Sequence, residues 1–207
     1  YLSKRVLPGG PGSGHMPDEV LERFVKDYID SVTSDEVVFS WQGGEPTLLG
    51  LEFFEKVVTL QKKHAKPGQR IENDLQTNGT LLDDDWARFL KQQRFLVGLS
   101  IDGPREIHDH CRITKHAEPT FDQVFAAAKM LQKHGVRFNT LTCVHRYNAS
   151  RPLAVYRFPR RGIRTTYSSS RSSRSRDSRK WLPGHGMKRG CRCPAIRAAT
   201  RITPNPW

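Results

Sequence analysis

Three polar segments that contain glycine each follow directly after a short apolar run. They are Gln42-Gly43-Gly44-Glu45-Pro46, Gln76-Thr77-Asn78-Gly79-Thr80 and Ser100-Ile101-Asp102-Gly103-Pro104. Two consecutive glycines let a ligand approach the backbone closely, and the Glu45 carboxylate can pair with an ammonium group. Each segment alone is typical of an ordinary turn. Together they concentrate more Gln, Glu, Asn, Ser and Asp than turns require, which favours a binding site.

Alternating helices and strands position these segments between residues 17 and 158. Helical periodicity predicts helices over 17–29, 51–65, 83–90 and 120–134, the last capped by Thr120. Runs of β-branched and aromatic residues predict strands over 36–41, 71–76, 95–101 and 136–144. This alternation predicts an α/β fold with a parallel sheet, either barrel-like or doubly wound. Because parallel strands end at one edge, the polar segments are expected on one rim.

Charge divides the chain of 207 residues into two parts, although the net charge of the whole is +13. Residues 1–158 contain 21 basic and 20 acidic side chains, whereas residues 159–207 contain 13 basic side chains and one acid, Asp177. The second part has only four Leu, Ile, Val or Phe residues. We therefore predict a core domain over 1–158 and a disordered, Arg/Ser-rich tail over 159–207.

Apolar runs and cysteines indicate where in the cell the protein is expected. No apolar run reaches the roughly 18–20 residues of a membrane span, and no leader opens the chain. Four cysteines in a chain of this length do not form a disulfide framework, which favours the cytoplasm. The chain begins at Tyr1, and no strand precedes residue 17, so the true N-terminus is expected upstream.

Four motifs in a fixed order resemble those of anaerobic sulfatase-maturating enzymes. They are Trp41-Gln-Gly-Gly-Glu-Pro-Thr47, Leu75-Gln-Thr-Asn-Gly-Thr80, Leu99-Ser-Ile-Asp-Gly-Pro104 followed by His108, Asp109 and Arg112, and Phe138-Asn-Thr-Leu-Thr142. These enzymes are radical S-adenosylmethionine (SAM) proteins with an additional C-terminal iron–sulfur domain, called SPASM. The resemblance covers about residues 1–158. It implies a partial (β/α) barrel, reductive cleavage of SAM at a [4Fe–4S] cluster, and oxidation of a sulfatase Cys or Ser to formylglycine.

The resemblance also implies site residues and partners. Gly43, Gly44 and Glu45 are expected to receive the amino group of SAM, and Arg112 its carboxylate. Further contacts with the cofactor are expected from Gln42, Ser100 and Tyr1, the last directly after the cluster-binding loop. No catalytic residue and no metal ligand is implied within the chain. The implied partners are a sulfatase polypeptide as substrate and flavodoxin or ferredoxin as electron donor.

The sequence departs from the family pattern in three places. The Cys-x3-Cys-x2-Cys cluster loop, expected directly before Tyr1, is not among these residues. His110-Cys111 stands where an aromatic residue usually precedes Arg112, and the resemblance stops at about Phe158. We therefore expect a fragment that is inactive as written, and poorly soluble because apolar surfaces stay uncovered. The tail is expected to result from translation in a shifted reading frame. Sequencing of the coding DNA tests this, because family motifs should then appear in another frame.

Several alternatives remain open at this point. The core also fits another peptide-modifying radical SAM enzyme, and the basic tail fits RNA binding, although it offers no ordered aromatic platform. Cys191 and Cys193, with only His185 nearby, fall short of a four-ligand metal site. His108 and Asp109 form either an acid–base pair or a loop cap. Cys111 in a loop and Cys143 in a strand are expected to be ordinary residues.

Overall fold

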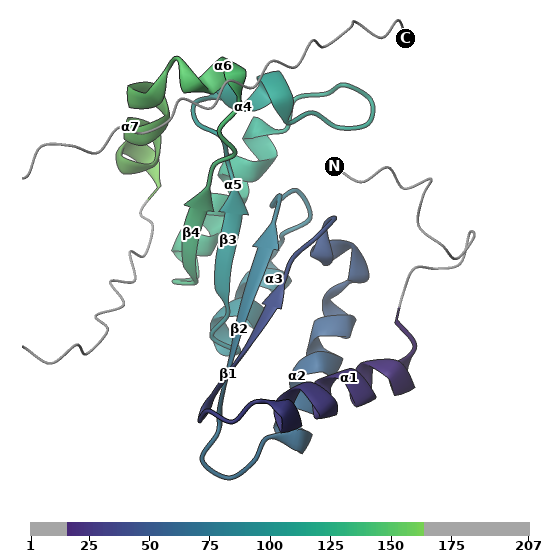
Figure 1. Cartoon of the computed structure of the whole chain (residues 1–207). Helices are drawn as coiled ribbons and strands as arrows, with labels where there is room; N and C mark the ends of the chain where they lie inside the picture. Colours follow the sequence, from purple (N-terminus) through teal and green to yellow (C-terminus); the bar gives the residue numbers. More distant parts are fainter. Residues whose placement is uncertain (1–15, 164–207) are drawn as a thin grey trace, which may run out of the picture. The chain divides into compact units, whose positions relative to one another are not determined.

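The computed structural model describes residues 16–163, which form twelve helical and strand elements (Figure 1). In chain order they are α1 (Asp18–Ser31), β1 (Glu36–Trp41), the 3-10 turn η2 (Pro46–Leu49), α2 (Leu51–His64), β2 (Arg70–Thr77), α3 (Asp84–Gln92), β3 (Leu96–Ser100), α4 (Arg105–Cys111), α5 (Phe121–Lys133), β4 (Arg137–Leu141), α6 (Arg146–Ala149) and α7 (Pro152–Gly162). All four strands and the four helices expected from the sequence are present. The predicted α/β class is therefore confirmed.

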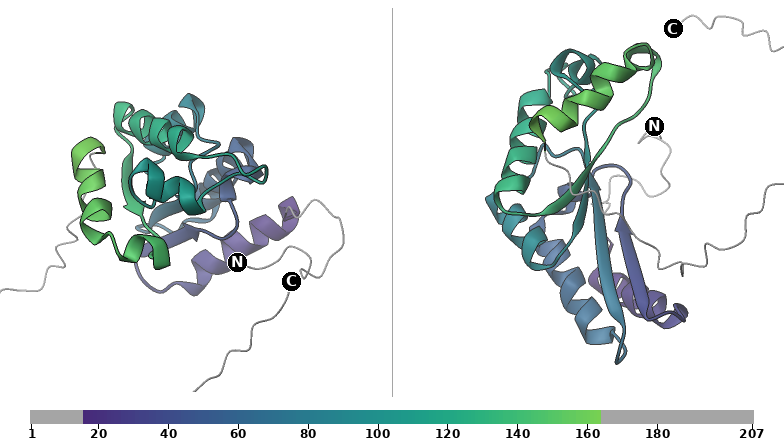
Figure 2. Two further views of the ribbon diagram at one scale, coloured as in Figure 1. Left: turned by 90° about the horizontal axis from the view of Figure 1, so that it is seen from above. Right: turned by 90° about the vertical axis from the view of Figure 1, so that its left-hand side faces the viewer.

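The four strands form one parallel sheet in the order β1-β2-β3-β4. A doubly wound sheet reverses its strand order and carries helices on both faces. Here the order follows the chain, and helices α2, α3 and α5 run along one face (Figure 2). The structure therefore resolves the alternative left open by the sequence in favour of a partial (β/α) barrel.

Strand register separates a helix-covered face from an open face. Trp41, Leu75, Val97 and Phe138 pair in one row across the sheet, and the last three are fully or almost fully buried against the helices. Because side chains alternate along a strand, the neighbouring row lies on the opposite face. That row consists of Ser40, Asp74, Leu96 and Arg137. The Ser40 hydroxyl donates to the Asp74 carboxylate at 2.9 Å, so the open face is largely polar.

A polar pair lies within the otherwise apolar layer between α2 and the sheet. The side-chain amides of Gln61 and Asn73 exchange two hydrogen bonds of 2.9 Å. The Trp41 indole donates a third, also of 2.9 Å, to the Asn73 oxygen. Buried amides are tolerated when they are paired in this way. The three side chains therefore align α2 with β1 and β2.

The ends of several elements differ from the predictions. The strand predicted over 136–144 ends at Leu141. Beyond it, the Thr142 hydroxyl and the Cys143 amide donate hydrogen bonds to the loop after β3. Cys143 thus follows the strand, and Cys111 ends α4 instead of lying in a loop. Helices α4, α6 and α7 were not predicted. Thr120 occupies the N-cap position of α5, but the Asp109 carboxylate accepts from the Thr120 and Phe121 amides.

The predicted boundary between core and tail lies close to the end of the described residues. Helix α7 continues to Gly162, and Ile163 is buried in the apolar core. Disorder was predicted from residue 159, which is wrong for residues 159–162, because these residues continue α7. The rest of the predicted tail and the Cys191-x-Cys193 pair fall on residues 164–207, outside the described part, and the division into two domains stays a prediction. Within residues 16–163, no helix combines the length and the apolar character that a membrane crossing requires.

Candidate functional site at the carboxyl edge of the sheet

The three polar segments predicted from the sequence lie at one edge of the sheet. Strands β1, β2 and β3 end at Trp41, Thr77 and Ser100, and each segment begins at or next to that residue. Because the strands are parallel, the arrowheads in Figure 1 point to this shared edge. Ser100 belongs to the open face by its position in β3, since it alternates with the buried Val97 and Leu99.

Glu45 joins the loop after β1 to the end of β2. Its Oε1 accepts hydrogen bonds from the Thr47 amide at 3.1 Å, the Thr47 hydroxyl at 2.6 Å and the Thr77 hydroxyl at 2.7 Å. Its Oε2 accepts from the Asn78 amide at 2.7 Å. Hydrogen bonds to an ionised acceptor are stronger than those between neutral groups. Both oxygens therefore hold the loop in place across 32 residues of chain.

Gly43 and Gly44 form an exposed backbone loop beside Glu45. Their φ angles are +103° and +58°, in the left-handed region that glycine adopts without a steric penalty. A Cβ atom built on either residue meets no heavy atom within 4 Å. Gln42, which precedes them, is also exposed. The loop consequently presents main-chain polar groups to open space at the rim of the sheet.

Asp102 and Arg112 form a second fixed group on the same edge. The Arg112 Nε and Nη2 atoms donate to the two Asp102 oxygens at 2.6 and 3.2 Å, and the Cys143 amide donates to Asp102 Oδ1 at 2.8 Å. The Asp102 side chain is 2% exposed and the Arg112 side chain 21%. A bidentate pair of this kind fixes the plane of the guanidinium. Asp102 therefore determines where Arg112 lies.

His108 connects this ion pair to helix α5. The Asp102 amide donates to His108 Nδ1 at 3.3 Å, and His108 Nε2 lies 3.1 Å from the Thr120 hydroxyl. That hydroxyl already donates its proton to the Arg112 carbonyl at 2.7 Å. Nε2 must therefore be the donor to Thr120 and Nδ1 the acceptor from Asp102, which defines the neutral Nε2–H tautomer. The side chain is 0% exposed.

The radical SAM superfamily is the family whose sequence model matches, over residues 3–158. The chain belongs to this superfamily. It is 46% identical over 158 residues to the serine-type anaerobic sulfatase-maturating enzyme of Bacteroides thetaiotaomicron, covering 76% of this chain and 38% of that one. It is 48% identical over 145 residues to the cysteine-type enzyme of Clostridium perfringens, covering 70% and 39%. The expected resemblance is therefore confirmed.

A solved structure is similar to this chain in both sequence and fold. The native anSMEcpe structure with bound AdoMet and the Cp18Cys peptide superposes with a TM-score of 0.69 at 47% identity. The match covers 72% of this chain and 41% of that chain. The chain thus spans about two fifths of the length of the relatives it matches.

The structure of this radical SAM chain places the predicted site residues in two groups. Gln42, Gly43, Gly44 and Glu45 lie on the loop after β1. Ser100 ends β3, and Arg112 directly follows α4 and pairs with Asp102 in the loop after β3. Tyr1 lies outside the described residues. Their individual contacts with SAM stay predictions. What the sequence did not reveal is that Asp102, Thr77 and His108 hold these residues in position.

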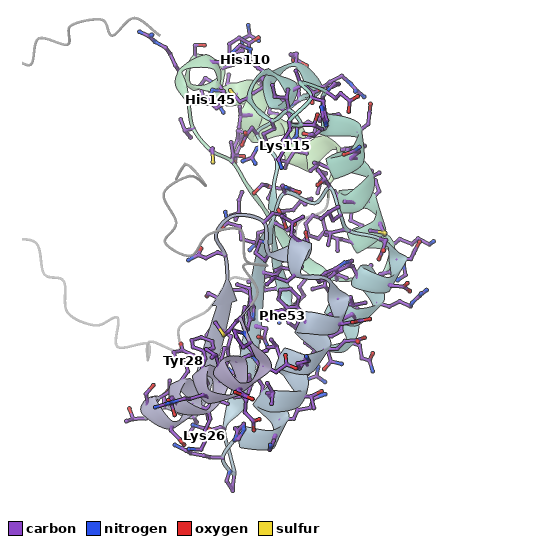
Figure 3. The ribbon with its side chains drawn as sticks, turned by 90° about the vertical axis from the view of Figure 1, so that its right-hand side faces the viewer. Lys26, Tyr28, Phe53, His110, Lys115 and His145 are labelled. Carbon is purple, nitrogen blue, oxygen red and sulfur yellow. The ribbon has the colours of Figure 1, made fainter. Side chains whose placement is uncertain are left out.

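His110 supplies an aromatic contact where the sequence departs from the family pattern. Its imidazole stacks on the Tyr147 ring, with a centroid distance of 3.8 Å and an interplanar angle of 18°. His145, from the N-terminus of α6, lies at the same end of the described part (Figure 3). Its Nδ1 atom is 3.8 Å from the Cys111 sulfur. Helices α4 and α6 are therefore joined by ring and sulfur contacts beside the Arg112 group.

An iron–sulfur cluster does not fit the described residues. Between residues 16 and 163, no group of three His, Cys, Asp or Glu side chains is arranged to hold a metal ion. Cys111 and Cys143 are free and exposed, and the family cluster requires three thiolates. The contacts of His108 and Asp109 fit the cap rather than the acid–base pair, because Asp109 accepts from the first amides of α5 while His108 is buried in the Asp102 network.

His108 is expected to make the stability of the fold dependent on pH. Burial lowers the pKa of His108 below its ordinary value of 6.5, and the nearby Arg112 guanidinium lowers it further. The unfolded chain then binds the proton more readily than the folded chain. The contribution of neutral His108 to the free energy of unfolding is therefore fully present above pH 6.5 and declines as the pH falls below it. Urea unfolding between about pH 7.5 and 5.5 should show this decline, and His108→Gln should flatten it.

The exposed His116 provides the matched control for this titration. His116→Gln makes the same change at an exposed position and should leave the pH dependence of the stability unchanged. An unchanged slope in His108→Gln would assign the decline to other groups and contradict the neutral tautomer.

Proposed function

We propose that this chain forms the SAM-binding part of a sulfatase-maturating radical SAM enzyme, which oxidises a sulfatase Cys or Ser to formylglycine. The matched relatives are sulfatase-maturating enzymes, and the solved structure contains AdoMet and a peptide, which supports the assignment. The observation that carries it is the open Gly43-Gly44 loop beside Glu45, whose carboxylate is hydrogen-bonded at the carboxyl edge. In parallel α/β folds this edge is where ligands bind.

The residues on this edge fit the charged groups of SAM. The Gly43-Gly44 backbone is open to the amino group, and the Glu45 carboxylate, which accepts hydrogen bonds from Thr77 and Asn78, lies next to it. Asp102 orients Arg112, whose side chain is partly exposed. We propose that the Arg112 guanidinium faces the carboxylate of SAM. When bound, SAM supplies radical chemistry through its reductive cleavage. The chain's own contribution is to bind and orient the methionine end of the cofactor.

We propose a sulfatase polypeptide as substrate, flavodoxin or ferredoxin as electron donor, and the cytoplasm as the location. Relatives of the serine type and of the cysteine type match at 46% and 48% identity. Peptides of both types therefore belong in any activity test.

A polypeptide consisting of these 207 residues should release no 5′-deoxyadenosine from SAM, since its cysteines are Cys111, Cys143, Cys191 and Cys193, without the spacing of a cluster loop. The measurement is chromatography of the products after anaerobic reconstitution with iron and sulfide and reduction with dithionite. The cysteine-type relative from Clostridium perfringens serves as the positive control. Product above a no-protein control would contradict this expectation.

A chimera tests the function itself. Only the part of this chain that aligns with the Bacteroides thetaiotaomicron relative, over 158 residues, replaces the corresponding segment of that relative. The remaining sequence of the relative stays intact. We expect this chimera to cleave SAM and to convert a Cys or Ser peptide to formylglycine, detected by mass spectrometry. A chimera that folds, holds its cluster and forms no formylglycine would refute the proposal.

Glu45→Gln in the chimera is expected to lower kcat/KM about tenfold or more. The amide group faces donors at both positions, so at least one charge-assisted hydrogen bond is lost, and 1.4 kcal/mol corresponds to a factor of about ten. Glu52→Gln, the same change at an exposed position in the first turn of α2, is the matched control. Equal rates for the two variants would show that the Glu45 network is dispensable.

A further inference from the structure

A pocket opens at the end of the sheet opposite the candidate SAM site. It has a volume of about 400 Å³ and is lined in part by Arg70, Glu72, Lys91, Arg94 and Arg137. Arg70 and Arg137 are the first residues of β2 and β4, and Lys91 and Arg94 lie at the end of α3. All of these lie at the amino ends of the parallel strands. We call this feature the basal pocket.

The charges of the basal pocket do not balance. Its lining contains four cationic side chains and a single carboxylate, Glu72. That carboxylate lies 3.4 Å from Arg70 and 3.6 Å from Arg137, and Arg70 also pairs with Glu36 at 2.8 Å. Lys91 donates to the Gly135 carbonyl at 2.8 Å instead. Among the described residues, neither Lys91 nor Arg94 has a carboxylate within ion-pair distance, so two positive charges remain uncompensated.

Helix capping accounts for only part of this arrangement. Cations at the end of a helix complement its dipole, which suffices for Lys91 and Arg94 alone. It does not explain Arg137, which approaches from β4 and donates to the Arg94 carbonyl at 2.9 Å. Two apolar residues, Leu90 and Phe95, also line the pocket, and both are buried. An apolar lining with several charged groups is typical of small-molecule sites of this volume.

Arg94 occupies a backbone position that favours glycine. Its φ angle is +58°, and it follows α3 where helices commonly end in a left-handed residue. The Phe95 amide donates to the Leu90 carbonyl at 2.9 Å, which closes this turn. A residue with a side chain is strained in such a conformation. The chain therefore places a guanidinium at the pocket where glycine would form the same turn more easily.

From these observations we infer that the basal pocket binds a small polyanion through phosphate or carboxylate groups. Arg94 and Lys91 provide the uncompensated charge, and Arg137 is held in place between Glu72 and the Arg94 carbonyl. Guanidinium groups match the geometry of both anions. The site is separate from the candidate SAM site, because it lies at the amino ends of the strands, and it does not depend on the proposed function.

Calorimetric titration of the 207-residue chain with pyrophosphate, and separately with citrate, tests this inference. Ionic strength is held constant with KCl, because screening alone changes the apparent affinity. We expect saturable binding with a Kd below about 1 mM for at least one of the two anions. The anion that binds more tightly identifies phosphate or carboxylate as the preferred group. Absence of saturable binding for both would overturn the inference.

Two variants of Arg94 separate binding from folding. Arg94→Gly and Arg94→Asn both suit a left-handed backbone, so neither should lower the melting temperature. Both should weaken anion binding by about tenfold or more, since a charge-assisted bond is lost. Arg23→Ala removes the same charge from the exposed face of α1, where the side chain is 84% exposed, and should bind like the parent. Equal weakening in all three variants, or none in the Arg94 variants, would overturn the inference.

Discussion

Replacing Arg112 by Met is expected to lower the free energy of unfolding by about 3–5 kcal/mol. The variant leaves the Asp102 carboxylate buried, with the Cys143 amide as its remaining donor in the described network. A buried charge without its partner carries the full cost of desolvation, because neither water nor a cation replaces the lost contact. Chemical denaturation followed by tryptophan fluorescence measures the loss.

Two comparisons isolate the contribution of the ion pair. The double variant Asp102→Asn with Arg112→Met should recover part of the stability, because a neutral amide costs less to bury than a carboxylate. Arg88→Met breaks the pair with Asp85 on the exposed face of α3 and should leave the unfolding midpoint almost unchanged. If Arg112→Met behaves like Arg88→Met, Asp102 does not depend on Arg112 in the way we describe.

Phe54→Ala should destabilise the fold to a similar extent, by about 3–5 kcal/mol. Its ring is 0% exposed. It packs edge-on against four aromatic rings, those of Trp41, Phe53, Trp86 and Phe95, with centroid distances between 5.3 and 6.3 Å. Removing it leaves a cavity bounded by rigid rings, which do not collapse readily into the space. Urea unfolding is the measurement.

Phe54 contacts both ends of the sheet, since Trp41 is the last residue of β1 and Phe95 directly precedes β3. Leu48→Ala, at a side chain that is 62% exposed, removes apolar volume without opening a cavity and should change stability little. Phe54→Leu should lie between the two, because most of the buried volume remains. Equal midpoints for Phe54→Ala and Leu48→Ala would contradict the packing described here.

Much of the fold could be predicted because each long element carries its own burial pattern. The helical period of α1, with Leu21, Val25 and Ile29 on one face, is legible without any neighbour. The short helix α4 was missed because seven residues show less than two full turns of periodicity, and α6 was missed for the same reason. The end of β4 was misplaced because contacts with the loop after β3, not propensity, terminate the strand.

The candidate site was predicted by residue type but not by partner. Glu45 was expected to face a ligand ammonium group, and the structure shows that both of its oxygens accept hydrogen bonds from Thr47, Thr77 and Asn78. Asp102 stood within an ordinary Asp-Gly-Pro turn, and no local pattern marked it as the partner of Arg112. The buried neutral His108 had no signal in the sequence beyond its spacing from Asp102.

The sequence by itself determined the elements, the parallel α/β class and the gathering of polar segments on one edge, because strand and helix periods are local and parallel strands share an end. Element periods left both a barrel-like and a doubly wound sheet open, the motif resemblance implied the barrel, and the strand order confirmed it. Tertiary structure alone decided the partners of Glu45, Asp102 and His108. It also brought Arg70, Arg94 and Arg137 around one pocket. The physical reason is that a hydrogen bond or ion pair between distant residues depends on strand register and helix packing, which no local period encodes.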